Sequence, residues 1–235
     1  MGRLAKPANT MIEPLRVFIG FDPVETVAYH VCVQSILKHA SVPVSFTPIN
    51  IRTLPEYTRK RDPKQSNEFS FTRFLTPYLA GYQGKALWMD CDMAVKCDIK
   101  ELFDLLTDEY VVACVQHDYT PSTKTKFLGN VQYDYPRKNW SSLMLFNADQ
   151  CRVLTPEYVS MAPASALHRL YWAKHSQILP LPTEYNHLVG EYTPNTEAKI
   201  YHWTLGTPCF QGYEEQEAPK YWYDLRNEVN YCEQP

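Results

Sequence analysis

Short apolar runs alternate with amphipathic segments along most of the chain. Residues 15–21 form the first apolar run, and in residues 25–39 the apolar positions recur every three to four residues, the spacing of one helix face. Residues 42–51 carry β-branched side chains and internal prolines, which favours a bent strand at a sheet edge. A strand, a helix and a strand at this spacing predict a βαβ unit, and therefore part of a parallel sheet.

The same alternation continues through the rest of the sequence. It predicts further strands at 85–89, 110–115, 143–146, 178–181 and 198–203, and helices at 71–79, 99–106 and 167–175. We interpret residues 1–14 as an N-terminal tail, and the aromatic, charged segment from about residue 212 as a packed arm or helix. The prediction is an α/β fold with one domain, residues 15–235, around a mixed, mainly parallel central sheet.

Composition excludes several function classes. Against 26 Asp and Glu the chain has 23 Lys and Arg, a formal net charge of −3, so we expect no basic face for nucleic acid. No apolar run approaches the roughly 20 residues that span a bilayer, and the N-terminus lacks the apolar stretch of a secretory signal. The seven cysteines are scattered without a C-x-x-C pair, which favours a reducing compartment and predicts a cytoplasmic protein.

Two acidic sites follow apolar strands, where ligands collect in open α/β sheets. The first is Asp22 after residues 15–21, and the sharper one is the pair Asp90 and Asp92. Side chains two apart in an extended segment point to the same side, and two carboxylates held that close repel unless a cation lies beside them. Mg²⁺ and Mn²⁺ take oxygen ligands and keep positions open for phosphate groups. The D-x-D pair therefore predicts a metal site for a diphosphate, although two solvated loop aspartates give the same pattern.

Residues 87–95, Leu-Trp-Met-Asp-Cys-Asp-Met-Ala-Val, resemble the acidic signature of glycosyltransferases with the GT-A fold. Among these enzymes the sequence is most similar to the glycogenin-like retaining members of family 8. Further motifs resemble the family's in the same order: Gly20-Phe21-Asp22, the helix with Arg73 at residues 71–77, the strand with Ser142 at 139–147, the segment ending at Asn186, and the run from Ile200 through His202 to Gly206.

The resemblance implies a metal-dependent, hexosyltransferase-like enzyme that moves a sugar from a nucleotide-diphosphate sugar to a glycan or other acceptor, with retention. It assigns Asp90, Asp92 and His202 to the metal, and Asp90, Asp92 and Arg73 to catalysis. It assigns contacts with the nucleotide sugar to Gly20, Phe21, Asp22, Arg73, Asp90, Ser142, Asn186 and Gly206. An imidazole ligand favours Mn²⁺ over Mg²⁺. The expected partners are the donor and a carbohydrate or lipid-linked acceptor, with peripheral membrane contact left open.

The sequence departs from the family pattern in four places, one of which is the strand at 139–147, where Trp140 and Ser142 stand in place of Asn and Gly. Glu25 stands where family members place an aromatic residue against uracil, the run after Gly206 lacks the lysine that contacts the diphosphate, and residues 165–169 hold no acid of the usual Asp-Gln pair. These departures leave open whether the donor nucleotide is UDP or GDP, and which sugar it carries. They also leave open a related fold that binds a nucleotide or glycan without turnover. A phosphatase with a nucleophilic first aspartate is a further alternative.

Overall fold

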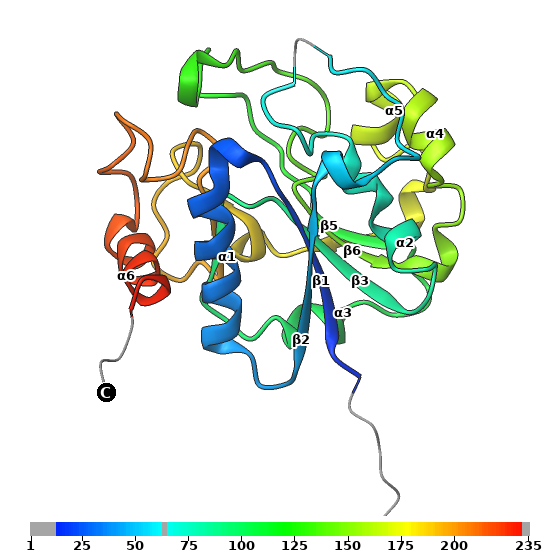
Figure 1. Ribbon diagram of the computed structural model, residues 1–235, viewed down its shortest axis with the longest axis horizontal. Coiled ribbons are helices and arrows are strands. Elements are labelled where there is room, and N and C mark those ends of the chain that lie inside the picture. The colour runs from blue at the N-terminus through cyan, green and yellow to red at the C-terminus, as the bar shows by residue number, and fades with distance from the viewer. Residues whose placement is uncertain (1–12, 63–64, 232–235) are drawn as a thin grey trace, which may run out of the picture.

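The computed structural model describes residues 13–62 and 65–231 and shows an α/β fold built around a six-stranded sheet (Figure 1). Its strand order is β2-β1-β3-β6-β5-β7. The strands are β1 (Leu15–Gly20), β2 (Val44–Ile49), β3 (Lys85–Met89), β5 (Val112–Val115), β6 (Leu143–Asn147) and β7 (Ile178–Leu181). Strand β1 is parallel to β2 and β3, and β5 to β7, whereas β6 runs antiparallel between β3 and β5. The predicted mixed, mainly parallel sheet is confirmed.

The first unit of the sheet follows directly from the local sequence. The Asp22 carboxylate accepts a hydrogen bond from the Val24 amide at 3.0 Å, which turns the chain through a short 3₁₀ helix (Pro23–Glu25) into α1 (Thr26–His39). The chain returns as β2, parallel to β1, so the predicted βαβ unit is confirmed. Pro48 is tolerated there because β2 is an edge strand.

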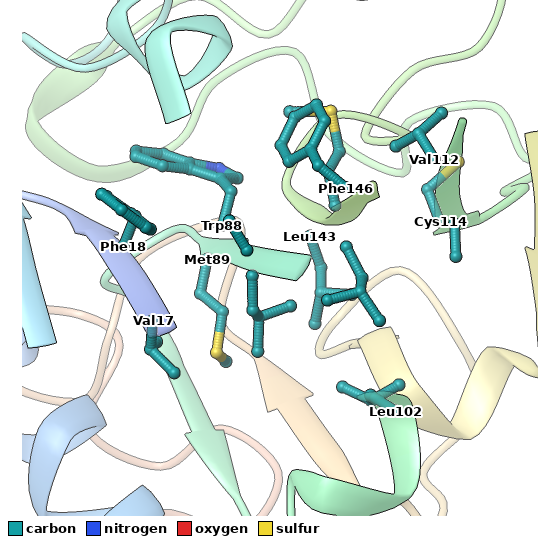
Figure 2. Close-up of a cluster of buried hydrophobic side chains, with 14 of the residues drawn as sticks. Val17, Phe18, Trp88, Met89, Leu102, Val112, Cys114, Leu143 and Phe146 are labelled. Carbon is teal, nitrogen blue, oxygen red and sulfur yellow. The ribbon is translucent and has the colours of Figure 1, made fainter. Parts of the chain in front are cut away.

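Apolar side chains cover both faces of the central strands (Figure 2). Every residue of β6 is buried, and so are the four residues of β3 after Lys85. Figure 2 shows Trp88 and Phe146 on one face and Met89 on the other, above Leu102 of α3 (Lys100–Leu105). Continuous apolar strands of this kind are expected where a sheet is covered on both sides, and they hold the strand ends in fixed positions.

A second, three-stranded sheet lies beside the central one. Its order is β4 (Met93–Val95), β9 (Ile200–His202) and β8 (His187–Leu188), with β9 antiparallel to β4 and parallel to β8. The hydropathy pattern did not predict β4 or β8, because strands of three and two residues carry no visible alternation. In this register His202 lies opposite Met93, directly after the acidic pair.

The helices differ from the predictions in two places, residues 156–161 and residues 167–175. Residues 71–79 are helical as predicted, a 3₁₀ turn (Thr72–Leu75) that continues into α2 (Thr76–Leu79). The predicted helix at 167–175 is wrong: α5 (Ala164–His168) ends earlier because Leu170 adopts a left-handed φ of 54°, and a 3₁₀ turn (His175–Gln177) follows separately. A further helix, α4 (Pro156–Met161), precedes α5.

Helix α6 (Pro219–Val229) lies within the segment predicted as a packed arm or helix. It packs beside α1, where Gln34 donates to the Glu228 carboxylate at 3.1 Å (Figure 1). Of the predicted N-terminal tail, residues 1–12 lie outside the described residues. Within the described chain, no helix combines the length and the apolar character that a membrane span requires.

Candidate active site

The turn between the two sheets brings the predicted metal ligands together. Asp90 and Asp92 lie in the turn that joins β3 to β4, and the Trp203 amide donates to the Asp92 carbonyl at 3.0 Å, which ties the end of β9 to this turn. One ligand atom each from Asp90, Asp92 and His202 lies within 4.8 Å of the others. All three residues are buried, so water solvates these charges poorly.

Hydrogen bonds fix the orientation of the His202 ring. Its Nδ1 lies 2.9 Å from the Asn186 Oδ1, the Asn186 Nδ2 donates to the Ser142 Oγ at 2.9 Å, and the Ser142 hydroxyl donates to the Asn139 carbonyl at 2.7 Å. Since the amide nitrogen of Asn186 points to Ser142, its oxygen must accept from the Nδ1–H of His202. In its neutral form the imidazole then presents the lone pair of Nε2 to the site, the arrangement that a metal ligand needs.

The donor set fits a divalent cation. The Nε2 of His202 lies 3.3 Å from the Asp92 Oδ1, yet this buried oxygen accepts no hydrogen bond. A lone pair facing a carboxylate oxygen is unfavourable unless a proton or a cation lies between them. Two carboxylates and one imidazole are ligands that Mn²⁺ accepts readily.

Arg73 is held against the other aspartate. Its Nη2 lies 3.1 Å from one carboxylate oxygen of Asp90 and 3.2 Å from the other, and its Nη1 donates to the Ser141 carbonyl at 2.9 Å. The Trp88 indole donates to the Asp90 Oδ1 at 3.1 Å. Arg73 is therefore a buried part of the site, and its Nε remains without a hydrogen-bond partner.

Negative charge is concentrated around the metal ligands. Burial raises the pKa of Asp90 to about 6, with Arg73 opposing and Asp92 adding to the shift. Burial also acts to raise the pKa of Asp92, but His202 and Lys126 hold it below its usual value. The pKa of Glu25 is raised well above normal by burial and then by Asp92, and its Oε2 is buried without a partner. A bound cation would relieve this repulsion.

A cavity of about 390 Å³ opens beside these residues, within the range of small-molecule sites. Arg73, Asp90, Asp92 and His202 all line it. The segment between β5 and β6 adds Lys126, Phe127, Tyr133, Asp134, Tyr135 and Lys138, and α5 with its following residue adds Ala164, Ser165, His168 and Arg169. No sequence motif marks the first of these walls, which is an irregular segment, and residues 165–169 of the second stand out in the sequence only because they lack the acid of the family's Asp-Gln pair.

The remaining residues predicted to contact the nucleotide sugar do not line this cavity: Gly20, Phe21, Asp22, Ser142, Asn186 and Gly206. Besides capping the 3₁₀ turn, Asp22 accepts from the Glu68 amide at 2.9 Å. At Gly20 an added Cβ would lie 2.4 Å from the Phe69 ring. Ser142 and Asn186 orient His202, as described above. Nucleotide contacts of these residues stay a prediction.

Comparisons with known proteins identify the family of the chain. Residues 30–155 match the model of glycosyl transferase family 8. Protein CDI of Arabidopsis thaliana is 44% identical over 228 residues, which cover 93% of this chain and 88% of that protein.

Among solved structures, three similar ones are glycosyltransferases. The WbbM bifunctional glycosyltransferase has a TM-score of 0.65 at 15% identity, covering 94% of this chain and 52% of its own. GlyE of Streptococcus pneumoniae TIGR4 scores 0.62 at 15% identity, covering 91% of this chain and 60% of its own. The galactosyltransferase LgtC scores 0.60 at 9% identity, covering 94% of this chain and 98% of its own. The chain thus spans about half of WbbM and nearly all of LgtC. It belongs to glycosyl transferase family 8 and is a glycosyltransferase with the GT-A fold.

Proposed function

We propose that this protein transfers a sugar from a nucleotide-diphosphate sugar to a carbohydrate or lipid-linked acceptor, with Mn²⁺ or Mg²⁺ held by Asp90, Asp92 and His202. The observation that carries the proposal is the unpartnered Asp92 Oδ1 facing the Nε2 of His202 at the wall of the cavity. The histidine favours Mn²⁺ over Mg²⁺. The ion, when bound, supplies positive charge for the diphosphate as the sugar leaves.

The chain's own groups bind and orient the donor. Arg73 is fixed at both ends of its guanidinium by Asp90 and the Ser141 carbonyl, so it needs little reorganisation to act as a planar cation. Its unpartnered Nε leaves one donor for a ligand oxygen. The buried site keeps water from the ionic contacts and so strengthens them.

We propose the stereochemical outcome and the binding of two substrates from the likeness to related proteins, and the location from the cysteines of the chain. Retention of configuration is proposed from the likeness to family 8. LgtC was solved with donor and acceptor sugar analogs, which supports binding of both substrates in one fold of this kind. A cytoplasmic location is supported by the described cysteines, Cys32, Cys91, Cys97, Cys114, Cys151 and Cys209, all free and all but the last buried. The assay below distinguishes a UDP-sugar from a GDP-sugar as the donor and identifies the sugar.

A panel of UDP- and GDP-sugars incubated with Mn²⁺ tests the proposal through release of the nucleoside diphosphate. We expect release with at least one donor, and a loss of roughly 100-fold or more in Asp92→Asn, because the metal loses a charged ligand. The control is Asp104→Asn, an exposed aspartate of α3 paired with Lys100, which should behave as wild type. Unchanged release in Asp92→Asn would refute the metal site. Nucleotide binding without release indicates a non-catalytic binder, and hydrolysis of an aryl phosphate indicates a phosphatase.

A further inference from the structure

We propose that Lys126 is the cationic side chain that binds the diphosphate of the donor, supplied by the segment between β5 and β6. The inference rests on the proposed function and deepens it. It concerns a residue that no motif in the sequence marks, because residues 116–138 show neither helical nor strand periodicity.

Lys126 shares the cavity with the metal ligands and is not committed to a partner. It lines the same cavity as Asp92 and His202, and its positive charge lowers the pKa of Asp92. Within residues 13–62 and 65–231, its Nζ forms no ion pair and donates no hydrogen bond, and it lies 5.9 Å from the centroid of the Phe127 ring. The donors of the ammonium group therefore remain available to a ligand in the cavity.

Of the other basic side chains that line the cavity, Arg73, apart from its Nε, and Lys138 are already engaged, and Arg169 lines it from the end of α5. Arg73 is bound to Asp90 and to the Ser141 carbonyl. Lys138 donates to the Tyr133 carbonyl at 2.6 Å and lies 5.0 Å from the Tyr135 ring centroid. Two carboxylates offset the charge of a divalent ion, so a dianionic diphosphate in the cavity needs a further cation. Lys126 is placed to supply it.

A rigid contact positions Lys126. The amide of Phe127 donates to the Leu205 carbonyl at 2.7 Å, and the Phe127 and Phe210 rings stack with centroids 4.7 Å apart. Gly206 has a φ of 147°, and an added Cβ there would lie 2.8 Å from the Phe127 Cβ. The turn that carries Lys126 is therefore seated on the Gly206 turn, whose own sequence provides no lysine for a phosphate.

The burial of two neighbouring ammonium groups agrees with an anion site. Burial lowers the pKa of Lys126, while Asp92, Glu25 and Asp90 act to raise it. Burial also lowers the pKa of Lys138, to about 8, with Lys126 adding to the shift. A bound diphosphate would stabilise both charges, because opposite charge favours the ionised form.

Calorimetric titrations of Lys126→Gln test the inference, first with Mn²⁺ alone and then with UDP and GDP at saturating Mn²⁺. The matched control is Lys124→Gln, an exposed lysine two residues earlier in the same segment. We expect Lys126→Gln to bind Mn²⁺ at least as tightly as wild type and the diphosphate roughly 10- to 100-fold more weakly, the usual effect of one hydrogen bond to a charged group. Lys126→Arg should restore most of the affinity, and Lys124→Gln should match wild type.

Two results overturn the inference while the proposed function stands. The first is diphosphate binding by Lys126→Gln within about twofold of wild type, and the second is an equal loss in Lys124→Gln, which would indicate long-range electrostatics only. If wild type binds neither UDP nor GDP with Mn²⁺, the proposed function and the inference fall together. Circular dichroism of each variant shows whether it is folded before its affinity is compared.

Discussion

Asn186 is expected to control metal affinity without touching the metal. It has no exposed surface, and its amide links the Nδ1 of His202 to the hydroxyl of Ser142 through two hydrogen bonds of 2.9 Å. Asn186→Leu keeps the branched shape and the number of side-chain heavy atoms but removes both bonds. The imidazole then loses the contact that holds its Nε2 lone pair toward Asp92.

The expected losses of stability and of metal affinity in Asn186→Leu follow from which groups are left without partners. The hydroxyl of Ser142 still donates to the Asn139 carbonyl, so the main loss is at the Nδ1–H of His202. One buried donor without a partner costs about 1–3 kcal/mol of unfolding free energy. Removal of a group that orients a metal ligand lowers metal affinity roughly 10- to 100-fold. His202→Ala, which removes the ligand itself, sets the upper limit of the effect.

The assay is titration calorimetry with Mn²⁺, paired with denaturant unfolding of the metal-free proteins. Asn147→Leu is the matched control, because Asn147 is also buried and donates to the carbonyls of Thr107 and Tyr110 at the opposite end of β6. It should lose comparable stability and keep its Mn²⁺ affinity. Asn186→Asp restores the acceptor and should stay within a few-fold of wild type. If folded Asn186→Leu binds Mn²⁺ like wild type, or if Asn147→Leu loses as much Mn²⁺ affinity, Asn186 does not orient His202 for the metal.

Two further predictions concern stability. Burial, with Arg73 and Arg59 adding, lowers the pKa of His168 to about 3, below its unfolded value near 6.5, so its contribution is present above pH 6.5 and is lost as the pH falls toward 3. Between pH 7.5 and 5, denaturant unfolding of His168→Gln should show a loss of stability smaller than that of wild type by up to about 2 kcal/mol, because His117, whose pKa burial also lowers to about 3, contributes equally to both proteins. An equal loss in the two proteins contradicts the assignment to His168. Gly20→Ala should lower the unfolding free energy by about 1–3 kcal/mol, because the new methyl meets the Phe69 ring. Thermal unfolding measures the stability of Gly20→Ala. A stability equal to that of wild type would mean that the Phe69 ring moves aside freely.

The sequence predicted the parts of the fold in which neighbouring residues determine the element. Strand β1, helix α1 and strand β3 have clear periodicity, and the structure has them within a residue or two of the predicted bounds. The helix predicted at 167–175 failed because its apolar spacing says nothing about the φ of Leu170, which turns the chain. Strands β4 and β8 exist only through pairing with β9, a contact between distant residues that local pattern does not encode.

The residues of the candidate site also differ in how far local sequence predicts their positions. Asp90 and Asp92 are adjacent to a strong strand, so their proximity was predictable from spacing alone. His202 lies 110 positions after Asp92 and could be joined to it only through a motif, whereas the structure does so through the register of β4 and β9. The roles of Asn186 and Ser142 required the direction of each hydrogen bond, which no sequence pattern states.

The two sheets each hold one half of the proposed metal site. Asp90 belongs to the central sheet, where its amide donates to the Ser142 carbonyl at the end of β6. His202 ends β9 of the small sheet, and the next residue, Trp203, is buried in a separate apolar cluster with Trp222 of α6. The indole of Trp203 also donates to the Glu217 carbonyl, just before α6. The position of the imidazole relative to the carboxylates therefore depends on how the C-terminal helix packs, because this cluster anchors the strand that carries His202. The proposed metal site and the C-terminal segment are thus one structural unit despite their separation in sequence.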